Sequence, residues 1–497
     1  MTERAVVIGS GFGGIASALR LRATGLEVEL VEKLPQLGGR AQVFERGGYR
    51  HDAGPTVITA PFLFDELFEL FGERREDHIE FRPLKPWYRF LFPDGDHFDY
   101  GGTLEDTLAE IERIHPPDCA GYESLVEQSR AIFNVAFSQL AHAPFHRFST
   151  MLKQLPQLAR LRSDRTVWQM VCKHLEHDKL RQAFSIQPLL VGGSPFDTTS
   201  IYGLIHYLER AYGIYFAMGG TGALVTALED LMRRQGIRIR TDCEVTQLTT
   251  QKRQITGVQL ASGETLTADH VVFNGDPMFL YRHLMSNRDL PLATRVKRDH
   301  SKLSMGLYVL FFGTDRQYPE VAHHTIWMGK RYRALLDDIF HKQHLADDFS
   351  LYVHRPTATD PSFAPAGHDS FYVLAPVPHQ GAGIDWEVEE PKLRARIIQA
   401  LDETMLPGLS SHIQEPFAMT PDNFSEQYLS HQGAGFSIAP LFSQSAWFRF
   451  HNQAEGFDNL YLAGAGTHPG AGMPGVLSSA KVVQGLVAQR MKPEAAA

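Results

Sequence analysis

The sequence of 497 residues contains no hydrophobic stretch long enough to cross a bilayer. Its longest uncharged apolar run, MGLYVLFFG from Met305 to Gly313, is nine residues long, whereas a spanning helix needs about 20. The aromatic and β-branched residues of this run predict an interior strand instead. The N-terminus lacks the basic segment and apolar core of a signal peptide, because Glu3 and a short β-branched run occupy that place. We therefore expect a cytoplasmic protein.

The chain is also poor in cysteine and has no excess of positive charge. Cys119, Cys172 and Cys243 are isolated, without CxxC spacing, which argues against a disulfide framework and against a zinc or iron–sulfur site. The net charge of −9 argues against a nucleic-acid partner. The 23 histidines are scattered and are densest at His323-His324. Without partner ligands at metal-binding spacing, we expect no metal there.

The N-terminus carries a dinucleotide-binding fingerprint. A β-branched run from Ala5 to Ile8 predicts a buried strand, the glycines of GSGFGG follow at once, and Glu32 ends the next predicted strand. In this pattern Gly9 makes the tight turn, Gly11 lets a pyrophosphate approach, and Gly14 lets the helix pack closely on the strand. The helix N-terminus would bind the pyrophosphate, and Glu32 would accept hydrogen bonds from the ribose hydroxyls.

The residues after Glu32 favour a flavin over a nicotinamide cofactor. A glycine turn presents Arg40, a cation able to reach the same pyrophosphate. A hairpin is predicted from Gln42 to Arg50, and a glycine–proline turn follows in HDAGPTVI. A nicotinamide site needs no such continuation, whereas a flavin ring lies at the far end of an extended cofactor and must be covered by further loops. The glycine-rich stretch AGAGTHPGAGMPG, residues 463–475, lies close to the C-terminus, where chains usually fray.

Together these motifs resemble the FAD-dependent amine oxidase and phytoene desaturase superfamily, whose pattern is GxGxxG, the acid, GGR and a glycine-rich C-terminal flavin loop. The resemblance to bacterial-type phytoene desaturases covers essentially the whole chain. The stretches that carry it are HDAGPTVI, LLVGGSPF, GKRYRALLDDIF, FYVLAPVPH, QSAWFRFHN and NLYLAGAGTHPGAGMPGVLSSAK. It implies FAD as cofactor, with the C-terminal loop crossing back to lie against the flavin.

Carried over residue by residue, the resemblance also implies the residues that bind FAD. They are Gly9, Ser10, Gly11, Phe12, Gly13, Gly14, Glu32, Lys33, Gly39, Arg40, Gly54, Pro55, Thr56, Val57, Val245, Asn274, Asp276, Gly464, Thr467, Met473, Gly475 and Val476. Glu209 and His468 match the family as candidate bases, but neither has a visible partner in the sequence, so we assign no catalytic side chain.

The expected fold class is α/β, with two interleaved domains. A Rossmann-like FAD-binding domain would comprise residues 1–75, 220–290 and 430–497. An α+β substrate domain with a helical membrane-associating region would comprise residues 76–219 and 291–429. A hairpin is predicted at Pro86–Tyr100.

An apolar, aromatic stretch from Ala183 to Gly220 is the expected wall of a hydrophobic channel that ends at the flavin. Its large side chains are Phe184, Leu189, Leu190, Phe196, Tyr202, Tyr207, Tyr212, Tyr215 and Phe216. The resemblance then implies desaturation of 15-cis-phytoene to lycopene or neurosporene, with hydride transfer to flavin N5 and proton loss from the neighbouring carbon.

Other activities on the same fold remain open. They are desaturation of C30 diapophytoene, polyene isomerisation, amine oxidation and, outside enzymes, lipid binding by an escort protein. The sequence has one dinucleotide fingerprint, so we expect quinone or dioxygen, rather than a second bound nicotinamide, to reoxidise the flavin.

The segment from Gln128 to Ser163 contains no Asp or Glu, although acids outnumber bases in the whole chain. Its bases are Arg130, Arg147, Lys153, Arg160 and Arg162, and its apolar residues are Phe145, Phe148, Met151, Leu152, Leu155, Leu158 and Leu161. Such a stretch can lie in a membrane interface. We expect peripheral attachment to the inner face of the cell membrane, with the channel mouth near residues 140–165; a basic helix packed on the core is the alternative.

Overall fold

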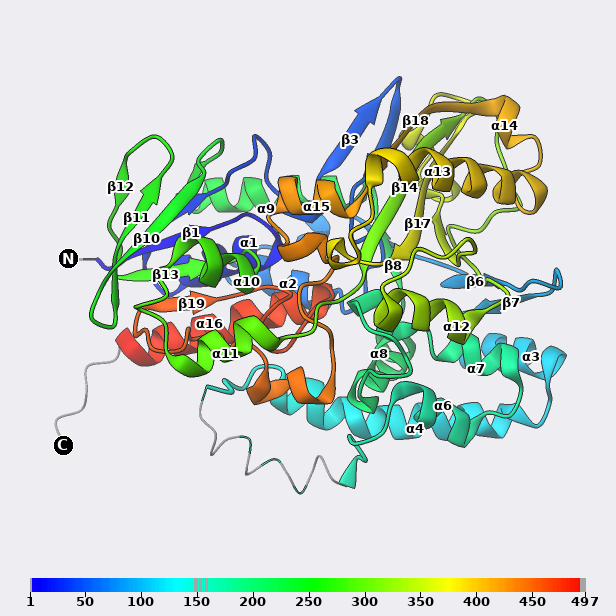
Figure 1. Ribbon diagram of the computed structural model, residues 1–497, viewed down its shortest axis with the longest axis horizontal. Helices are drawn as coiled ribbons and strands as arrows, with labels where there is room; N and C mark the ends of the chain where they lie inside the picture. The colour runs from blue at the N-terminus through cyan, green and yellow to red at the C-terminus, as the bar shows by residue number, and fades with distance from the viewer. Residues whose placement is uncertain (1, 147–150, 152–153, 155, 157–159, 492–497) are drawn as a thin grey trace.

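Two β-sheets built from interleaved parts of the chain organise the protein (Figure 1). The structure is a computed structural model and describes residues 2–146, 151, 154, 156 and 160–491. The first sheet is parallel throughout. Its strands, in spatial order, are β19 (Leu460–Leu462), β13 (His270–Phe273), β1 (Arg4–Ile8), β2 (Glu27–Val31) and β9 (Arg238–Arg240). The strands predicted at Ala5–Ile8 and before Glu32 are confirmed.

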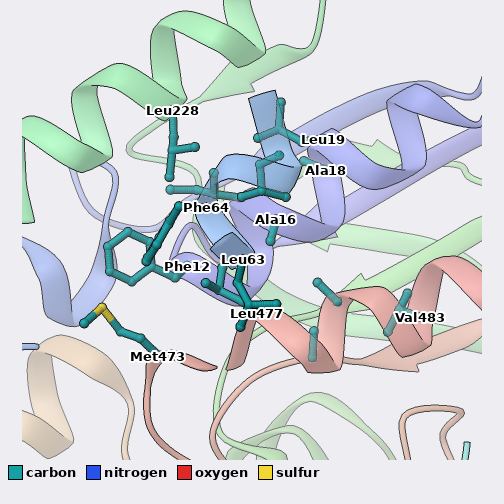
Figure 2. Packing of buried hydrophobic residues seen from close by; sticks show 14 of the residues in the cluster. Phe12, Ala16, Ala18, Leu19, Leu63, Phe64, Leu228, Met473, Leu477 and Val483 are labelled. Atoms are coloured by element: carbon teal, nitrogen blue, oxygen red, sulfur yellow. The ribbon is translucent and has the colours of Figure 1, made fainter. Parts of the chain in front are cut away.

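Two helices from opposite ends of the chain, α1 (Phe12–Ala23) and α16 (Met473–Met491), pack against this sheet (Figure 1). Helices α2 (Phe62–Glu69) and α9 (Gly220–Arg234) pack against α1. Figure 2 shows Phe12 of α1 beside Phe64 of α2, with Leu477 of α16 in the same cluster. These side chains are almost fully buried, so the first and last helices of the described chain share one hydrophobic core.

A smaller antiparallel sheet flanks the first one. Its strands are β10 (Val245–Gln251), β11 (Gln254–Leu260) and β12 (Thr265–Leu266). Val258 and Leu266 pack there with Val6 and Val271 of the parallel sheet. Val245, at the start of β10, belongs to the same cluster, so this contact holds the smaller sheet against the parallel one.

The second large sheet is mixed and has seven strands. In spatial order they are β18 (Ile413–Met419), β14 (Gly306–Thr314), β17 (Asp369–Val377), β16 (Leu351–His354), β15 (His324–Trp327), β6 (Tyr88–Leu91) and β7 (His97–Tyr100). Every residue of β14 is buried, which confirms the interior strand predicted there. The β6–β7 hairpin confirms the one predicted at Pro86–Tyr100.

A helical layer lies below this sheet in Figure 1. Its helices are α3 (Leu104–Ile114), α4 (Asp118–Val135), α6 (Val167–His174), α7 (Asp178–Phe184) and α8 (Leu204–Tyr212). Capping boxes at Thr103 and Thr166 begin α3 and α6, because each threonine accepts an amide of the first turn while a side chain three residues on caps it in return. One π-helical turn, η3 (Ala136–Leu140), continues α4.

The remaining strands are short and form two sheets of two strands each. They are β3 (Val43–Arg46) with β4 (Tyr49–Asp52), which form the hairpin predicted after Arg40, and β5 (Phe81–Pro83) with β8 (Tyr215–Ala217). The remaining α-helices are α10 (Pro277–Phe279), α11 (Leu292–His300), α12 (Tyr332–Asp337), α13 (Trp386–Glu403), α14 (Leu409–His412) and α15 (Pro421–Tyr428). Within the described residues, none of the helices has both the length and the apolar character of a membrane span.

Candidate functional site

A cavity of about 590 Å³ runs from the glycine loop after β1 to the apolar side chains of the helical layer and the second sheet. Its lining includes Gly11 and Glu32 at one end and Leu208, Tyr352 and Leu374 at the other. Every residue expected to bind the cofactor lines this cavity except Gly14 and Thr467. The fold therefore brings the predicted residues together from the N-terminal, middle and C-terminal parts of the chain.

The glycine loop has the close contacts that its sequence predicts. Gly9 has a φ of +92°, which favours glycine. A Cβ on Gly14 would lie 1.9 Å from the Gly9 carbonyl oxygen, so Gly14 serves helix–strand packing and not cavity lining. Helix α1 begins after Gly11 with no side-chain cap and no acidic residue in its first turn. Its first N–H groups, at the positive end of the helix dipole, are thus suited to an anion.

Glu32 lies at the end of β2 and braces the same loop. One carboxylate oxygen, Oε2, accepts hydrogen bonds from the Ser10 amide and the Ser10 hydroxyl, both at 2.7 Å. The other oxygen accepts the Leu34 amide at 2.9 Å. Glu32 therefore holds the loop in shape while also lining the cavity.

Arg40 lines the cavity, but its guanidinium is already engaged by the chain. It donates to the Gly435 carbonyl and to the Ser430 hydroxyl. Burial lowers the pKa of Arg40, and the negative charge of Asp276 opposes that effect. The cation expected at the pyrophosphate thus also clamps the turn before the C-terminal segment. A Cβ on Gly54 would lie 2.0 Å from the Arg40 carbonyl oxygen, so Gly54 permits this approach.

The residues after β13 join the nucleotide end of the cavity to the C-terminal segment. The Asn274 side chain lies against the glycine loop and donates to the Ala463 carbonyl at 2.9 Å. The Asp276 carboxylate accepts the His431 amide at 3.0 Å and the Ser437 hydroxyl at 2.9 Å. Both side chains line the cavity, and they connect its nucleotide end to the C-terminal segment.

The C-terminal loop lines the cavity through Gly464, Met473, Gly475 and Val476. Thr467, expected to contact the cofactor, is 1% exposed and instead hydrogen-bonds to the Gly464 carbonyl at 3.1 Å. Thr467 therefore does not line the cavity, because its hydroxyl closes a turn inside the loop.

The sequence analysis missed Arg449, which holds this loop in place. Its fully buried guanidinium donates to the carbonyls of Thr467, at 3.0 Å, and Ala465, at 2.6 Å. The nearby Asn452 amide donates to the His468 carbonyl at 2.8 Å. The sequence signal for this role is the arginine within the aromatic stretch WFRFHN, because a cation buried among aromatic side chains needs hydrogen-bond acceptors.

The wall expected from Ala183–Gly220 is present, but other side chains build most of it. Leu189, Leu190 and Tyr202 line the cavity. The expected residues that do not line it are Phe184, Phe196, Tyr207, Tyr212, Tyr215 and Phe216. Their places are taken by Ile186, Ile201, Leu204, Ile205 and Leu208. Only one face of a helix can line a cavity, so Ile205 and Leu208 of α8 point into the cavity whereas Tyr207 points away from it.

Part of the basic segment proposed for membrane contact, including Arg147, Phe148, Leu152, Lys153, Leu155 and Leu158, lies outside the described residues. Phe145 and Met151 are described, and they are 3% and 5% exposed and line the cavity. The Phe145 ring lies 4.7 Å from that of His468. The expectation that these two side chains face lipid is therefore corrected, because both are inside the protein.

Glu209 lies in the apolar part of the cavity wall. The Tyr88 hydroxyl donates to its Oε1 at 3.4 Å, and Oε2 has no hydrogen-bond partner among the described residues. Burial raises the pKa of Glu209 to about 8, so the carboxyl is mostly protonated at neutral pH. In that state it is a proton donor and not a base.

His468, the other candidate base, lies in the C-terminal loop and also lines the cavity. Its Nε2 lies 3.0 Å from the Leu140 carbonyl, to which it donates in the neutral form. Burial lowers the pKa of His468 to about 4. The imidazole is thus neutral, and it joins the C-terminal loop to the end of η3.

Comparison with known proteins finds one matching family model, flavin containing amine oxidoreductase, over residues 12–483. Curated relatives match nearly end to end. A phytoene desaturase (lycopene-forming) of Pantoea ananas is 44% identical, covering 97% of this chain and 98% of its own length. A phytoene desaturase (neurosporene-forming) of Rhodobacter capsulatus is 41% identical, covering 99% of this chain and 95% of its own length.

Solved structures share the fold. Wild-type putrescine oxidase bound to putrescine superposes with a TM-score of 0.64, covering 99% of this chain and 100% of that one, at 13% sequence identity. This likeness concerns the arrangement of the chain and leaves the substrate undetermined.

Proposed function

Because the chain belongs to the flavin-containing amine oxidoreductase family, we propose that it is an FAD-dependent phytoene desaturase of carotenoid biosynthesis that forms lycopene or neurosporene. The observation that carries this proposal is the cavity, which has an anion-binding helix end and Glu32 on one side and a hydrocarbon-lined chamber on the other. A dinucleotide with an oxidising ring and a long polyene together require that combination.

The residues present fit FAD. The uncapped start of α1 suits its pyrophosphate, Glu32 its ribose and Val245 its adenine, while Met473 to Val476 would lie against the ring and ribityl chain. All strands of the parallel sheet come from residues 1–75, 220–290 and 430–497, which supports assigning the FAD-binding domain to these segments. All strands of the seven-stranded sheet come from the other two segments.

In the reaction, the chain positions the polyene and excludes water. When bound, FAD supplies the chemistry by accepting a hydride from an allylic carbon. The apolar side chains at Leu189, Leu208 and Leu374 hold hydrocarbon without a polar anchor. Glu209 is mostly protonated and His468 is hydrogen-bonded to the Leu140 carbonyl, so neither candidate is assigned as the proton acceptor.

Turnover with defined polyenes tests the proposal. The purified protein, loaded with FAD, should convert 15-cis-phytoene in liposomes to a product with the absorption spectrum of lycopene or neurosporene. A parallel reaction with C30 diapophytoene measures selectivity. Conversion of the C30 compound alone would reassign the substrate, and retention of FAD with no conversion of either polyene would refute desaturation.

We further propose that the protein attaches to the inner face of the cell membrane through residues 128–163. The buried Phe145 and Met151 connect this segment to the cavity, and Arg160 and Arg162 are exposed at its end. A long hydrocarbon cannot reach the cavity through water at a useful concentration, so a path from the bilayer is needed.

Charge reversal at this segment tests the attachment. The variant Lys153→Glu, Arg160→Glu, Arg162→Glu should no longer sediment with anionic liposomes while its FAD content is unchanged. A matched control reverses the exposed Arg253, Lys342 and Lys392, which lie elsewhere, and should still sediment. Equal sedimentation of both variants would exclude this segment as the attachment site.

We also propose that quinone or dioxygen accepts the electrons from the reduced flavin, since the chain has one dinucleotide fingerprint. Turnover should stop under anaerobic, quinone-free conditions and resume on addition of a quinone. Sustained turnover with NAD or NADP as the acceptor would contradict this assignment.

A further inference from the structure

Three buried histidines meet in the second sheet. His324 begins β15, His323 directly precedes it, and His354 ends the neighbouring strand β16. The antiparallel register sets His324 directly opposite His354. Their exposed fractions are 6%, 0% and 1%, and one ring nitrogen of each lies within 4.8 Å of the others. The sequence spacing hid this group, because His354 is thirty residues away and arrives only through strand pairing.

Each of the three rings has a buried nitrogen without a hydrogen-bond partner among the described residues. Nε2 of His323, Nε2 of His324 and both nitrogens of His354 are buried and unpartnered within the described residues. Buried polar atoms usually have a partner, so four unpartnered nitrogens in one place call for an explanation. Burial lowers the pKa of all three rings, that of His354 to about 3, so each offers a lone pair at neutral pH.

Two hydroxyl groups orient the rings. The Thr359 hydroxyl lies 2.7 Å from Nδ1 of His323, and the Tyr352 hydroxyl lies 2.8 Å from Nδ1 of His324. A proton on each Nδ1, donated to the hydroxyl, leaves Nε2 as the free acceptor. Metal-binding histidines commonly have this arrangement, in which the second nitrogen donates to an outer partner.

We propose that His323, His324 and His354 bind one divalent first-row transition-metal cation, with Zn²⁺ as the ion best matched to three neutral imidazoles. Zinc bonds to nitrogen are about 2.0–2.1 Å long, which places tetrahedral ligand atoms about 3.3 Å apart. The three nitrogens are spread by up to 4.8 Å, so modest side-chain rotation brings them onto the ion. No carboxylate competes for the ion in the group.

The ion would connect to the cavity through Tyr352. The Tyr352 hydroxyl lies 2.6 Å from the Thr56 hydroxyl as well as near His324, and both Tyr352 and Thr56 line the cavity. The ion would therefore fix β15 and β16 to each other and hold one polar point of the cavity wall.

Metal titration tests the proposal directly. Protein without a histidine tag, stripped with a chelator and dialysed, is titrated with Co²⁺ and Zn²⁺. We expect one ion per chain, with the d–d absorption of four-coordinate Co²⁺ that Zn²⁺ displaces. His354→Gln should abolish stoichiometric binding. Tyr352→Phe, which removes the partner of His324, should weaken binding about 10–100-fold.

His206→Gln is the matched control, because His206 is also fully buried with both nitrogens unpartnered but lies outside the group. It should bind the ion as the wild type does. The proposal is overturned if wild-type protein binds no Co²⁺ with ligand-field absorption, or if His206→Gln and His354→Gln lose binding equally. Because the first measurement uses wild-type protein, a variant that fails to fold does not remove the test.

Discussion

At the scale of single residues, Gly14 has room for a hydrogen atom and no more. A Cβ there would lie 1.9 Å from the Gly9 carbonyl oxygen, so Gly14→Ala must push α1 away from β1. We expect the variant to lose FAD on gel filtration and to unfold more readily by about 1–3 kcal/mol, as overpacked sites do. The flavin-to-protein absorbance ratio and the urea midpoint measure both effects.

The control for this change is Gly485→Ala in α16, where an added Cβ meets nothing within 4 Å. Alanine in a helix interior is favoured over glycine by about 1 kcal/mol, so this variant should keep FAD and be no less stable. A Gly14→Ala protein that retains FAD as well as Gly485→Ala would show that the loop tolerates the shift.

Glu209 predicts a stability difference that depends on pH. Its pKa is about 8 in the folded protein and near 4.5 in the unfolded chain. Between these values the unfolded chain has lost the proton that the folded protein keeps, so this group makes stability fall as pH rises. Glu209→Gln removes that slope. Relative to wild type, the variant should gain stability from pH 5 to pH 8, by an order of about 4 kcal/mol at most.

Urea unfolding of both proteins at pH 5, 6.5 and 8 checks this expectation. A stability difference that stays constant from pH 5 to pH 8 would instead mean that Glu209 is ionised in the folded protein, because neither state would then titrate in this range. Product formation by the same variant gives a second readout: unchanged turnover is expected if the carboxyl is structural.

At the scale of elements, His468 joins the C-terminal loop to the end of η3 through its bond to the Leu140 carbonyl. His468→Gln preserves a donor at this position, whereas His468→Leu leaves the carbonyl without one. We expect the glutamine variant to keep turnover within a few-fold of wild type and the leucine variant to lose FAD and activity together. Equal, large losses of turnover in both variants, with FAD retained, would instead make His468 a proton acceptor.

The sequence predicted those parts of the site that depend on local backbone geometry. The glycines of the N-terminal loop, Glu32 and the C-terminal loop were predictable because turns and close approaches leave a signature within a few residues. The sequence did not predict which side of α8 faces the cavity, since Ile205 and Tyr207 are both apolar and only tertiary packing selects between them. His354 and Arg449 were missed because strand register and buried carbonyls, neither visible in the sequence, define their partners.

At the scale of the whole molecule, buried neutral histidines make the fold sensitive to acid. Burial lowers the pKa of His51, His206 and His468 to about 4 each. Below pH 6.5 these histidines become protonated in the unfolded chain but stay neutral in the folded protein. The free energy of unfolding therefore decreases as pH falls from 6.5 towards 4. Each histidine contributes up to about 1.4 kcal/mol per pH unit in that window.

Comparing unfolding free energies at pH 7 and pH 5 measures this slope. His206→Gln should flatten it by up to about 1.4 kcal/mol per pH unit, because one of the titrating groups is gone. The same slope in both proteins would mean that His206 accepts a proton within the fold, for which the structure offers its ring no partner among the described residues.

The parallel sheet takes β1 and β2 from the start of the chain and β19 from its end, and α1 packs against α16 (Figure 1). During synthesis, β1 and α1 leave the ribosome long before their partners exist. Until β19 and α16 have been synthesised, the apolar face of α1 stays exposed and can bind chaperones or aggregate. We therefore expect FAD binding to follow the synthesis of β19, so that nascent chains stopped before Leu460 retain no FAD.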